Sequence, residues 1–268
     1  MSTTGRVTAA FAAAAAGERA ALIGYLPAGF PDTVTATKAA LAMAQAGADI
    51  IEVGLPYSDP LMDGPVIADA VHRALKNGAR VKDVLDTVHA IAEAGTAVLV
   101  MTYWNPVDQY GVDAFARDLA NAGGAGLITP DLTPEEAGPW LAAAEKHGLD
   151  RVFLVAPSST TQRIARIADV CRGFVYAASL MGITGTREAV SSSAEGLVSR
   201  VREHTSLPVA VGLGVSTRDQ AAQVATFADG VIVGSAFVRR LAAASDPDTA
   251  VAGVRALAAD LAAGVRRQ

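Results

Sequence analysis

Residues 207–238 read LPVAVGLGVSTRDQAAQVATFADGVIVGSAFV, and one pattern occurs twice within them. The short apolar runs Leu207–Val211 and Asp229–Val233 are rich in β-branched residues, which favours strands. A turn that contains glycine follows each run, and Thr217–Ala225 between them has the apolar spacing of a helix. Because both faces of these strands are apolar, they are predicted to be parallel strands in a buried sheet.

The same unit, a strand followed by a helix, recurs along the rest of the chain. The predicted strands are Ala21–Pro27, Asp49–Val53, Ala97–Tyr103, Ala125–Thr129, Arg151–Val155, Gly173–Ala177, Leu207–Val211 and Asp229–Val233. The predicted helices are Thr33–Ala46, Val66–Asn77, Val81–Glu93, Val112–Ala122, Pro134–His147, Thr160–Val170, Ala189–His204 and Thr217–Ala225. Eight units predict an α/β fold, the (β/α)8 TIM barrel, with an extra N-terminal helix and a C-terminal helix.

An open, doubly wound sheet is the main alternative architecture. Its dinucleotide-binding form usually carries GxGxxG after the first strand, whereas this chain reads YLPAGFPD there. A length of 268 residues would suit one barrel or two smaller domains, but no proline- or serine-rich linker divides the chain. Residues 1–268 are therefore predicted to form a single barrel domain.

Composition excludes several classes of function. The net charge of −5 argues against nucleic acid as a partner, which would need clustered Lys and Arg. A single cysteine, Cys171, and four histidines far apart in sequence give no metal-site motif. A membrane span needs about 20 consecutive apolar residues, and no such run is present. The alanine-rich segment Thr8–Ala16 is predicted to be a short amphipathic helix rather than a signal peptide, and the protein is expected to be cytoplasmic.

Glycines mark a candidate phosphate site after the last two strands. Gly212, Gly214 and Ser216 follow the seventh strand, and Gly234 and Ser235 follow the eighth at the start of a short helix. Glycines let backbone N–H groups approach a phosphate, and the helix N-terminus adds partial positive charge. Barrels commonly bind phosphate at these two strand ends, although the glycines could simply make tight turns.

Two carboxylates lie in or after the second strand, in DIIEVGLPYSDPLMDGP. Glu52 interrupts an apolar run near the strand end, so its side chain is predicted to point into the barrel mouth with a raised pKa. Asp63 lies in the proline- and glycine-rich loop that follows. Together they could form an acid–base pair. The alternative is that Glu52 has a buried structural role and that Asp59 and Asp63 are turn or capping residues.

The segment IEVGLPYSDPLMDGPVI resembles the signature of the tryptophan synthase α subunits. The supporting matches, which follow the order of that family along most of the chain, are YLPAGFPD, MTYWNPV, ITPDLTPEE, MGITGTR, GLGVS and VGSAFV. The first segment is highly specific, whereas the glycine loops are common among barrels.

The resemblance implies a role for each matching residue. Glu52 and Asp63 match the two catalytic carboxylates of the family, and Thr184 matches a threonine of a lid loop that bonds the aspartate when the site closes. The positions implied for the substrate phosphate are Gly185, Gly214, Gly234 and Ser235. The positions implied for the substrate pocket are Tyr25, Met101, Ile128 and Tyr176.

The resemblance also implies a reaction and a partner. The family cleaves indole-3-glycerol phosphate into indole and glyceraldehyde 3-phosphate by a retro-aldol reaction, and passes indole to a β subunit in an α2β2 complex. Trp104, Asn105, Pro106 and Pro56–Pro60 would lie at the docking face. No cofactor is expected in this chain, because pyridoxal phosphate belongs to the β subunit.

Two alternatives remain open at this point. One is another phosphosugar barrel, although the predicted strand ends show neither the lysine of an imine-forming aldolase nor the histidines of a metal-dependent epimerase. The other is a barrel that is mainly an allosteric subunit, with little activity alone.

Overall fold

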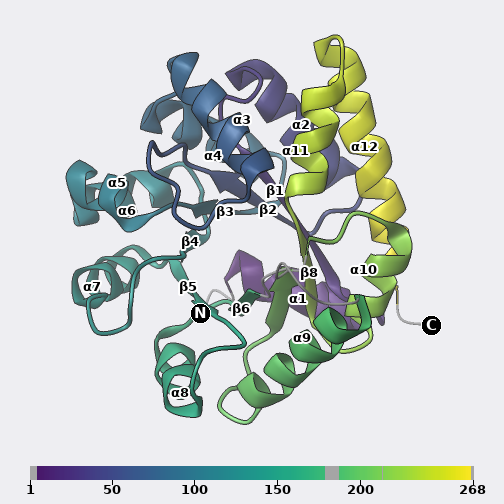
Figure 1. Ribbon diagram of the computed structural model, residues 1–268. Helices are drawn as coiled ribbons and strands as arrows, with labels where there is room; N and C mark the ends of the chain where they lie inside the picture. Colours follow the sequence, from purple (N-terminus) through teal and green to yellow (C-terminus); the bar gives the residue numbers. More distant parts are fainter. Residues whose placement is uncertain (1–4, 179–186, 213, 267–268) are drawn as a thin grey trace.

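The computed structural model describes residues 5–178, 187–212 and 214–266, and these residues form a closed barrel of parallel strands (Figure 1). The strands are β1 (Ala21–Pro27), β2 (Ile50–Gly54), β3 (Ala97–Met101), β4 (Gly126–Thr129), β5 (Asp150–Val155), β6 (Val175–Ala178), β7 (Val209–Gly212) and β8 (Gly230–Val233). Each strand pairs with the next in sequence, and β8 pairs with β1 to close the barrel. The predicted fold class is confirmed.

Helices surround the barrel on its outer side, except for the first, which lies across its N-terminal end. They are α1 (Arg6–Ala16), α2 (Thr33–Gln45), α3 (Pro65–Lys76), α4 (Val81–Glu93), α5 (Trp104–Tyr110), α6 (Val112–Asn121), α7 (Gly138–His147), α8 (Thr161–Val170), α9 (Arg187–Arg202), α10 (Arg218–Ala225), α11 (Ser235–Ala243) and α12 (Pro247–Gly264). The extra N-terminal helix is α1, and the C-terminal helix is α12, which packs against α2, α10 and α11. None of the helices in the described ranges is long and apolar enough to span a bilayer.

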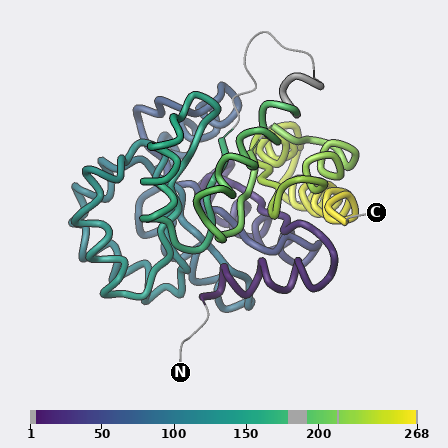
Figure 2. The backbone as a smooth tube through the Cα atoms, turned by 90° about the horizontal axis from the view of Figure 1, so that it is seen from below, coloured from purple at the N-terminus to yellow at the C-terminus, as the bar shows by residue number. Residues whose placement is uncertain are grey.

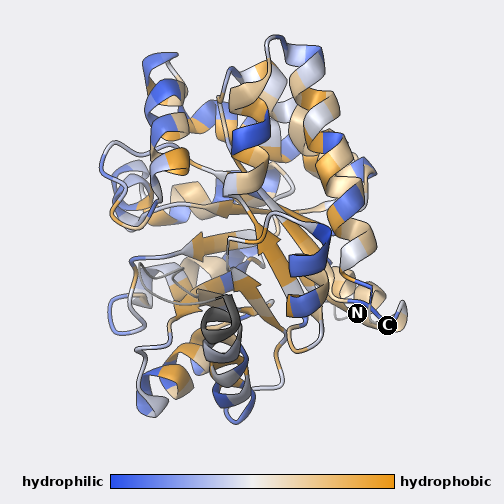
Figure 3. Cartoon of the chain, turned by 45° about the vertical axis from the view of Figure 1, so that its right-hand side comes forward, coloured by the Kyte–Doolittle hydropathy of each residue, from blue (hydrophilic) through white to orange (hydrophobic). Residues whose placement is uncertain are grey.

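Two apolar layers hold the barrel together. In Figure 3 the strands at the centre are strongly hydrophobic, whereas the helices alternate hydrophobic and hydrophilic residues. The outer layer joins strands to helices and includes Ile51, Val53 and Trp140. The inner layer fills the barrel, and its strand residues include Ile23, Ile50 and Leu99. Side chains along a strand alternate between the two layers, and this alternation decides which residues reach the barrel interior.

Helix α1 closes the N-terminal end of the barrel. Its buried residues Val7, Phe11 and Ala14 belong to the inner layer, and the ring of Phe11 packs on that of Phe174 with 5.5 Å between centroids. Figure 2 shows α1 in purple at the bottom of the molecule, across one end of the barrel. Among the residues that the structure describes, the N-terminal end of the barrel is thus filled by apolar side chains, and the cavity that reaches Glu52 lies at the carboxyl ends of the strands.

Helix α5 was not predicted from the sequence. The predicted third strand ran to Tyr103, but the strand ends at Met101 and a helix begins at Trp104. The carboxylate of Asp131 accepts a hydrogen bond from the Trp104 N–H at 2.9 Å, which satisfies one of the donors that a helix leaves free at its first turn. This cap comes from 27 residues away, so the local sequence does not reveal it.

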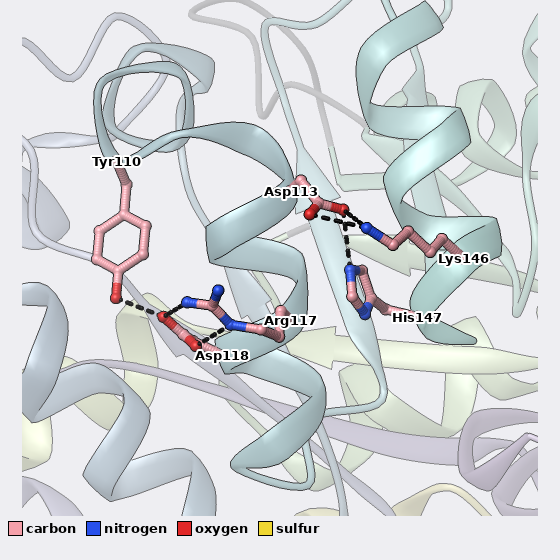
Figure 4. A network of polar contacts seen from close by, with 6 residues as sticks. All are labelled: Tyr110, Asp113, Arg117, Asp118, Lys146 and His147. Carbon is pink, nitrogen blue, oxygen red and sulfur yellow. Dashed lines mark hydrogen bonds and ion pairs between the residues drawn. The ribbon is translucent and has the colours of Figure 1, made fainter.

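Polar contacts tie α5 and α7 to α6 (Figure 4). The Tyr110 hydroxyl donates to Asp118 at 2.8 Å, and the Lys146 ammonium donates to Asp113 at 2.9 Å. Arg117 and His147 complete the two clusters. These contacts are largely exposed, so each contributes little to stability. The Tyr110–Asp118 bond joins α5 to α6, and the contacts of Asp113 join α6 to α7.

Candidate active site

A cavity of about 430 Å³ opens at the carboxyl ends of the strands. Its volume lies within the usual range for a site that encloses a small organic ligand. Its lining residues are Tyr25, Glu52, Met62, Asp63, Gly64, Pro65, Val66, Ile67, Met101, Tyr103, Pro130, Leu154, Tyr176, Ala178, Gly212, Gly214, Ile232, Gly234, Ser235 and Arg239. They come from most of the strands and from the loops that follow them, as expected for a barrel active site.

Glu52 lies in the wall of this cavity and is completely buried. It is two residues after Ile50 on β2, so both side chains point into the barrel. Neither Oε1 nor Oε2 has a hydrogen-bond partner among the residues that the structure describes. Burial raises the pKa of Glu52 to about 8, because the carboxylate loses water and gains no donor in return. The group is thus mostly protonated at neutral pH.

Asp63 lies in the loop before α3 and also lines the cavity. Its Oδ1 accepts a hydrogen bond from the Tyr103 hydroxyl at 3.3 Å. The same hydroxyl accepts one from the Met62 N–H at 2.8 Å, so Tyr103 contacts the loop at two adjacent residues. Burial raises the pKa of Asp63, and the bond from Tyr103 partly offsets this.

Tyr25, which is buried, and Tyr176, which is half-buried, both lie on the cavity wall. Tyr25 pairs in register with Glu52 across β1 and β2. Burial, followed by the nearby carboxylates, raises the pKa of both phenols well above the ordinary value, so they stay neutral. Both rings also pack on glycines: a Cβ on Gly54 would lie 2.3 Å from the Tyr25 hydroxyl, and one on Gly212 would lie 2.7 Å from that of Tyr176.

The apolar part of the cavity includes Met101 and Leu154. Ile128 pairs in register with Met101 but is completely buried in the inner layer and does not line the cavity.

One end of the cavity is built from backbone at the ends of β7 and β8. Gly214 has φ +68°, a left-handed conformation that favours glycine. Gly234 caps the N-terminus of α11, where the N–H groups of Ser235 and Ala236 have no carbonyl of the helix to bond. These groups and the helix dipole favour an anion. Gly185 and Thr184, the other two predicted residues, lie outside the described residues.

Sequence reasoning did not identify several lining residues. Leu154 could have been found from strand alternation, because it follows Val152 of the inner layer by two residues. Arg239 follows Ser235 by four residues on α11, a spacing that places both on one helix face. Tyr103 had no signal of its own. In the part of the chain that the structure covers, no three His, Cys, Asp or Glu side chains gather as a metal site.

Comparisons with known proteins agree on one family. The family model for the tryptophan synthase alpha chain matches residues 11–266. The tryptophan synthase alpha chain of Mycobacterium avium is 62% identical over 251 residues, which cover 94% of this chain and 91% of that one. A solved M. tuberculosis tryptophan synthase chain superposes with a TM-score of 0.92 at 57% identity, with 98% and 99% of the two chains covered. An aminoacrylate-bound form of the M. tuberculosis enzyme superposes with a TM-score of 0.90 at 55% identity, covering 98% of this chain and 100% of that chain.

Proposed function

Since this chain belongs to the tryptophan synthase alpha chain family and cleaves indole-3-glycerol phosphate, we propose that Glu52 is its acid–base catalyst and that Asp63 stabilises the charge that develops on the indole ring. The observation that carries the proposal is the burial of Glu52 in the cavity with a pKa of about 8 and no partner among the described side chains. A carboxyl group in this state can donate a proton at neutral pH and take one back.

The reaction proceeds in two proton transfers. Indole leaves poorly as a carbanion, so protonated Glu52 first donates its proton to C3 of the ring. The ring nitrogen becomes cationic, and the Asp63 carboxylate accepts a hydrogen bond from its N–H and stabilises this charge. The ionised Glu52 then takes the proton of the adjacent side-chain hydroxyl, that carbon becomes the aldehyde, and the electron pair of the broken carbon–carbon bond returns to the ring. Glu52 ends the cycle protonated.

The substrate is expected to lie across the cavity with its phosphate at the ends of β7 and β8. We assign phosphate binding to Gly185, Gly214, Gly234 and Ser235. Tyr25, Met101, Ile128 and Tyr176 form the proposed indole pocket, with Ile128 supporting Met101 from within the barrel wall. Thr184 is assigned the closing contact to Asp63. The positive backbone dipoles at one end and the apolar wall at the other support this orientation.

A β subunit that carries pyridoxal phosphate is the proposed partner, in an α2β2 complex to which indole is passed. The support is the face beside the cavity mouth. Leu61 is 84% exposed and Met62 51%, which is unusual for large apolar side chains and typical of an interface. A separate groove is lined by Pro56 and Pro106 from the two segments expected at the docking face, and by Tyr110 of α5. The proposal takes residues 1–268 as one domain, and the biosynthetic function supports the cytoplasm as its location.

The test is indole release from indole-3-glycerol phosphate by the purified chain, alone and with a β subunit. Glu52→Gln keeps the size of the side chain but cannot transfer a proton, so kcat is expected to fall by about 10²–10⁴-fold while substrate still binds. An active Glu52→Gln variant would contradict the assignment. A rate that is high only with the β subunit would favour the mainly allosteric alternative.

A further inference from the structure

Arg239 carries the single positive charge among the described residues that line the cavity. The other ionisable lining groups are Glu52, Asp63 and three tyrosines, none of which carries a positive charge. A phosphate monoester carries a charge of about −1.5 to −2 at pH 7. Without a cationic side chain, neutral backbone N–H groups and the Ser235 hydroxyl would have to hold this charge in a cavity that also contains two carboxyl groups. The site as assigned so far therefore lacks a cationic side chain for the phosphate.

Arg239 is placed on α11 so that its side chain can supply this charge. It follows Ser235 by four residues, so the two side chains lie on the same face of the helix, about 6 Å apart along the axis. Side chains of a helix lean toward its N-terminus. The side chain of Arg239 is therefore expected to lean toward the first turn of α11, and Arg239 lines the cavity together with Gly234 and Ser235.

The guanidinium also has no other described role. Arg239 is exposed, and no carboxylate of the described chain lies within ion-pair distance of it. Its neighbour Arg240 is equally exposed but does not line the cavity, because successive helical residues point about 100° apart. Both arginines are exposed and neither forms an ion pair with a described carboxylate, so Arg240 is a matched control for Arg239.

We propose that Arg239 binds the phosphate of the substrate and determines the preference of the enzyme for a phosphorylated side chain. Its guanidinium forms charge-assisted hydrogen bonds to phosphate oxygens that the glycine loops leave unoccupied, a geometry that arginine favours. This inference rests on the proposed phosphate site at β7 and β8. It adds a side chain to a site that otherwise consists of backbone groups and one hydroxyl.

The experiment compares Arg239→Gln with Arg240→Gln, which removes the same charge one residue away. Binding of glycerol 3-phosphate is measured by calorimetry, and KM and kcat are measured with indole-3-glycerol phosphate. Arg239→Gln is expected to raise both the Kd of glycerol 3-phosphate and KM by about tenfold or more. The reason is that the loss of a hydrogen bond to a charged group weakens binding by about this factor. The value of kcat should change little, because the contact is the same in the ground and transition states.

The controls separate this inference from the function on which it rests. Arg240→Gln should behave like the wild type, and Arg239→Lys should regain part of the affinity. The affinity of the wild type for glycerol 3-phosphate should fall more steeply with added salt than the affinity of Arg239→Gln for the same ligand. Equal affinities for wild type and Arg239→Gln would overturn the role of Arg239 alone. Failure of the wild type to bind glycerol 3-phosphate would overturn the phosphate site, and the inference with it.

Discussion

The Tyr103 hydroxyl lies 3.3 Å from Asp63 Oδ1 and donates a hydrogen bond to it. Tyr103 follows β3, whereas Asp63 lies in the loop after β2, so the bond connects two neighbouring strand ends. The oxygen of the Tyr103 hydroxyl also accepts a hydrogen bond from the Met62 N–H, so Tyr103 holds both the Asp63 carboxylate and the backbone beside it. Tyr103 is thus a positioning residue for the proposed stabiliser of the indole ring.

Replacing this hydroxyl should affect catalysis more than binding. Tyr103→Phe is expected to lower kcat by about tenfold, the value of one hydrogen bond, and to change KM less. The bond lowers the pKa of Asp63, so its loss should move the acidic limb of the pH–rate profile to higher pH. Tyr57→Phe is the matched control, because it removes a tyrosine hydroxyl from a neighbouring ring. The centroids of the Tyr57 and Tyr103 rings are 5.6 Å apart. Identical pH profiles for wild type and Tyr103→Phe would contradict this role.

The rate should depend on pH through Glu52. The proposed mechanism begins with the protonated form, and the pKa of this group in the folded protein is about 8. We therefore expect kcat/KM to fall above about pH 8, with the apparent pKa of the free enzyme. On the acidic side Asp63 must be ionised, and its raised pKa places that limb above the ordinary range of an aspartate. A rate that stays constant well above pH 8 would show that a different group donates the proton.

The same burial should make the fold less stable at alkaline pH. The folded state holds the Glu52 proton up to about pH 8, whereas the unfolded chain loses it near the ordinary value of 4.5. Between these values the folded state binds more protons, so the free energy of unfolding falls as pH rises. Glu52→Gln removes this contribution, which amounts to about 5 kcal/mol above pH 8. Denaturant unfolding of both proteins at pH 5 and pH 9 measures it, and parallel pH dependences would contradict the prediction.

The cap of α5 should be required for partner docking. Asp131→Ala removes the acceptor of the Trp104 N–H, and loss of a cap of this kind costs about 1 kcal/mol of helix stability. Helix α5 begins with the residues proposed to contact the β subunit. We expect weaker binding of the β subunit in calorimetry and nearly unchanged indole release by the isolated chain. Asp131→Asn, which keeps an acceptor oxygen, should lie between wild type and Asp131→Ala. Unaltered β binding by Asp131→Ala would exclude α5 from the interface.

Local patterns were sufficient to predict most of the fold. Buried β-branched runs located all eight strands to within a few residues, because strand alternation and helical spacing are properties of neighbouring residues. Contacts between distant residues were not visible in this way. Helix α5 depends on Asp131. Helix α7 begins at Gly138 rather than at the predicted Pro134, because residues 134–136 form a turn.

The cavity was predictable to a similar extent. The position of Glu52 near the strand end, inside an apolar run, predicted a side chain in the barrel mouth, and Glu52 does line the cavity. The glycine loops predicted the end of the cavity that β7 and β8 form. The height of each side chain along the barrel axis depends on strand register, which the sequence does not reveal. This is why Met101 reaches the cavity and Ile128, its partner in register, does not. Tyr103 and Arg239 were missed because their positions depend on how loops and helices meet at the mouth.

The ring of Phe11 packs on that of Phe174 and closes the N-terminal end of the barrel interior. A molecule that enters at the carboxyl ends of the strands cannot leave through the filled N-terminal end. Substrate and products therefore both pass the carboxyl-terminal face of the barrel. A protein that docks on this face is positioned to receive a product of the cavity before that product reaches bulk water. The filled N-terminal end of the barrel thus determines the side on which a product is released.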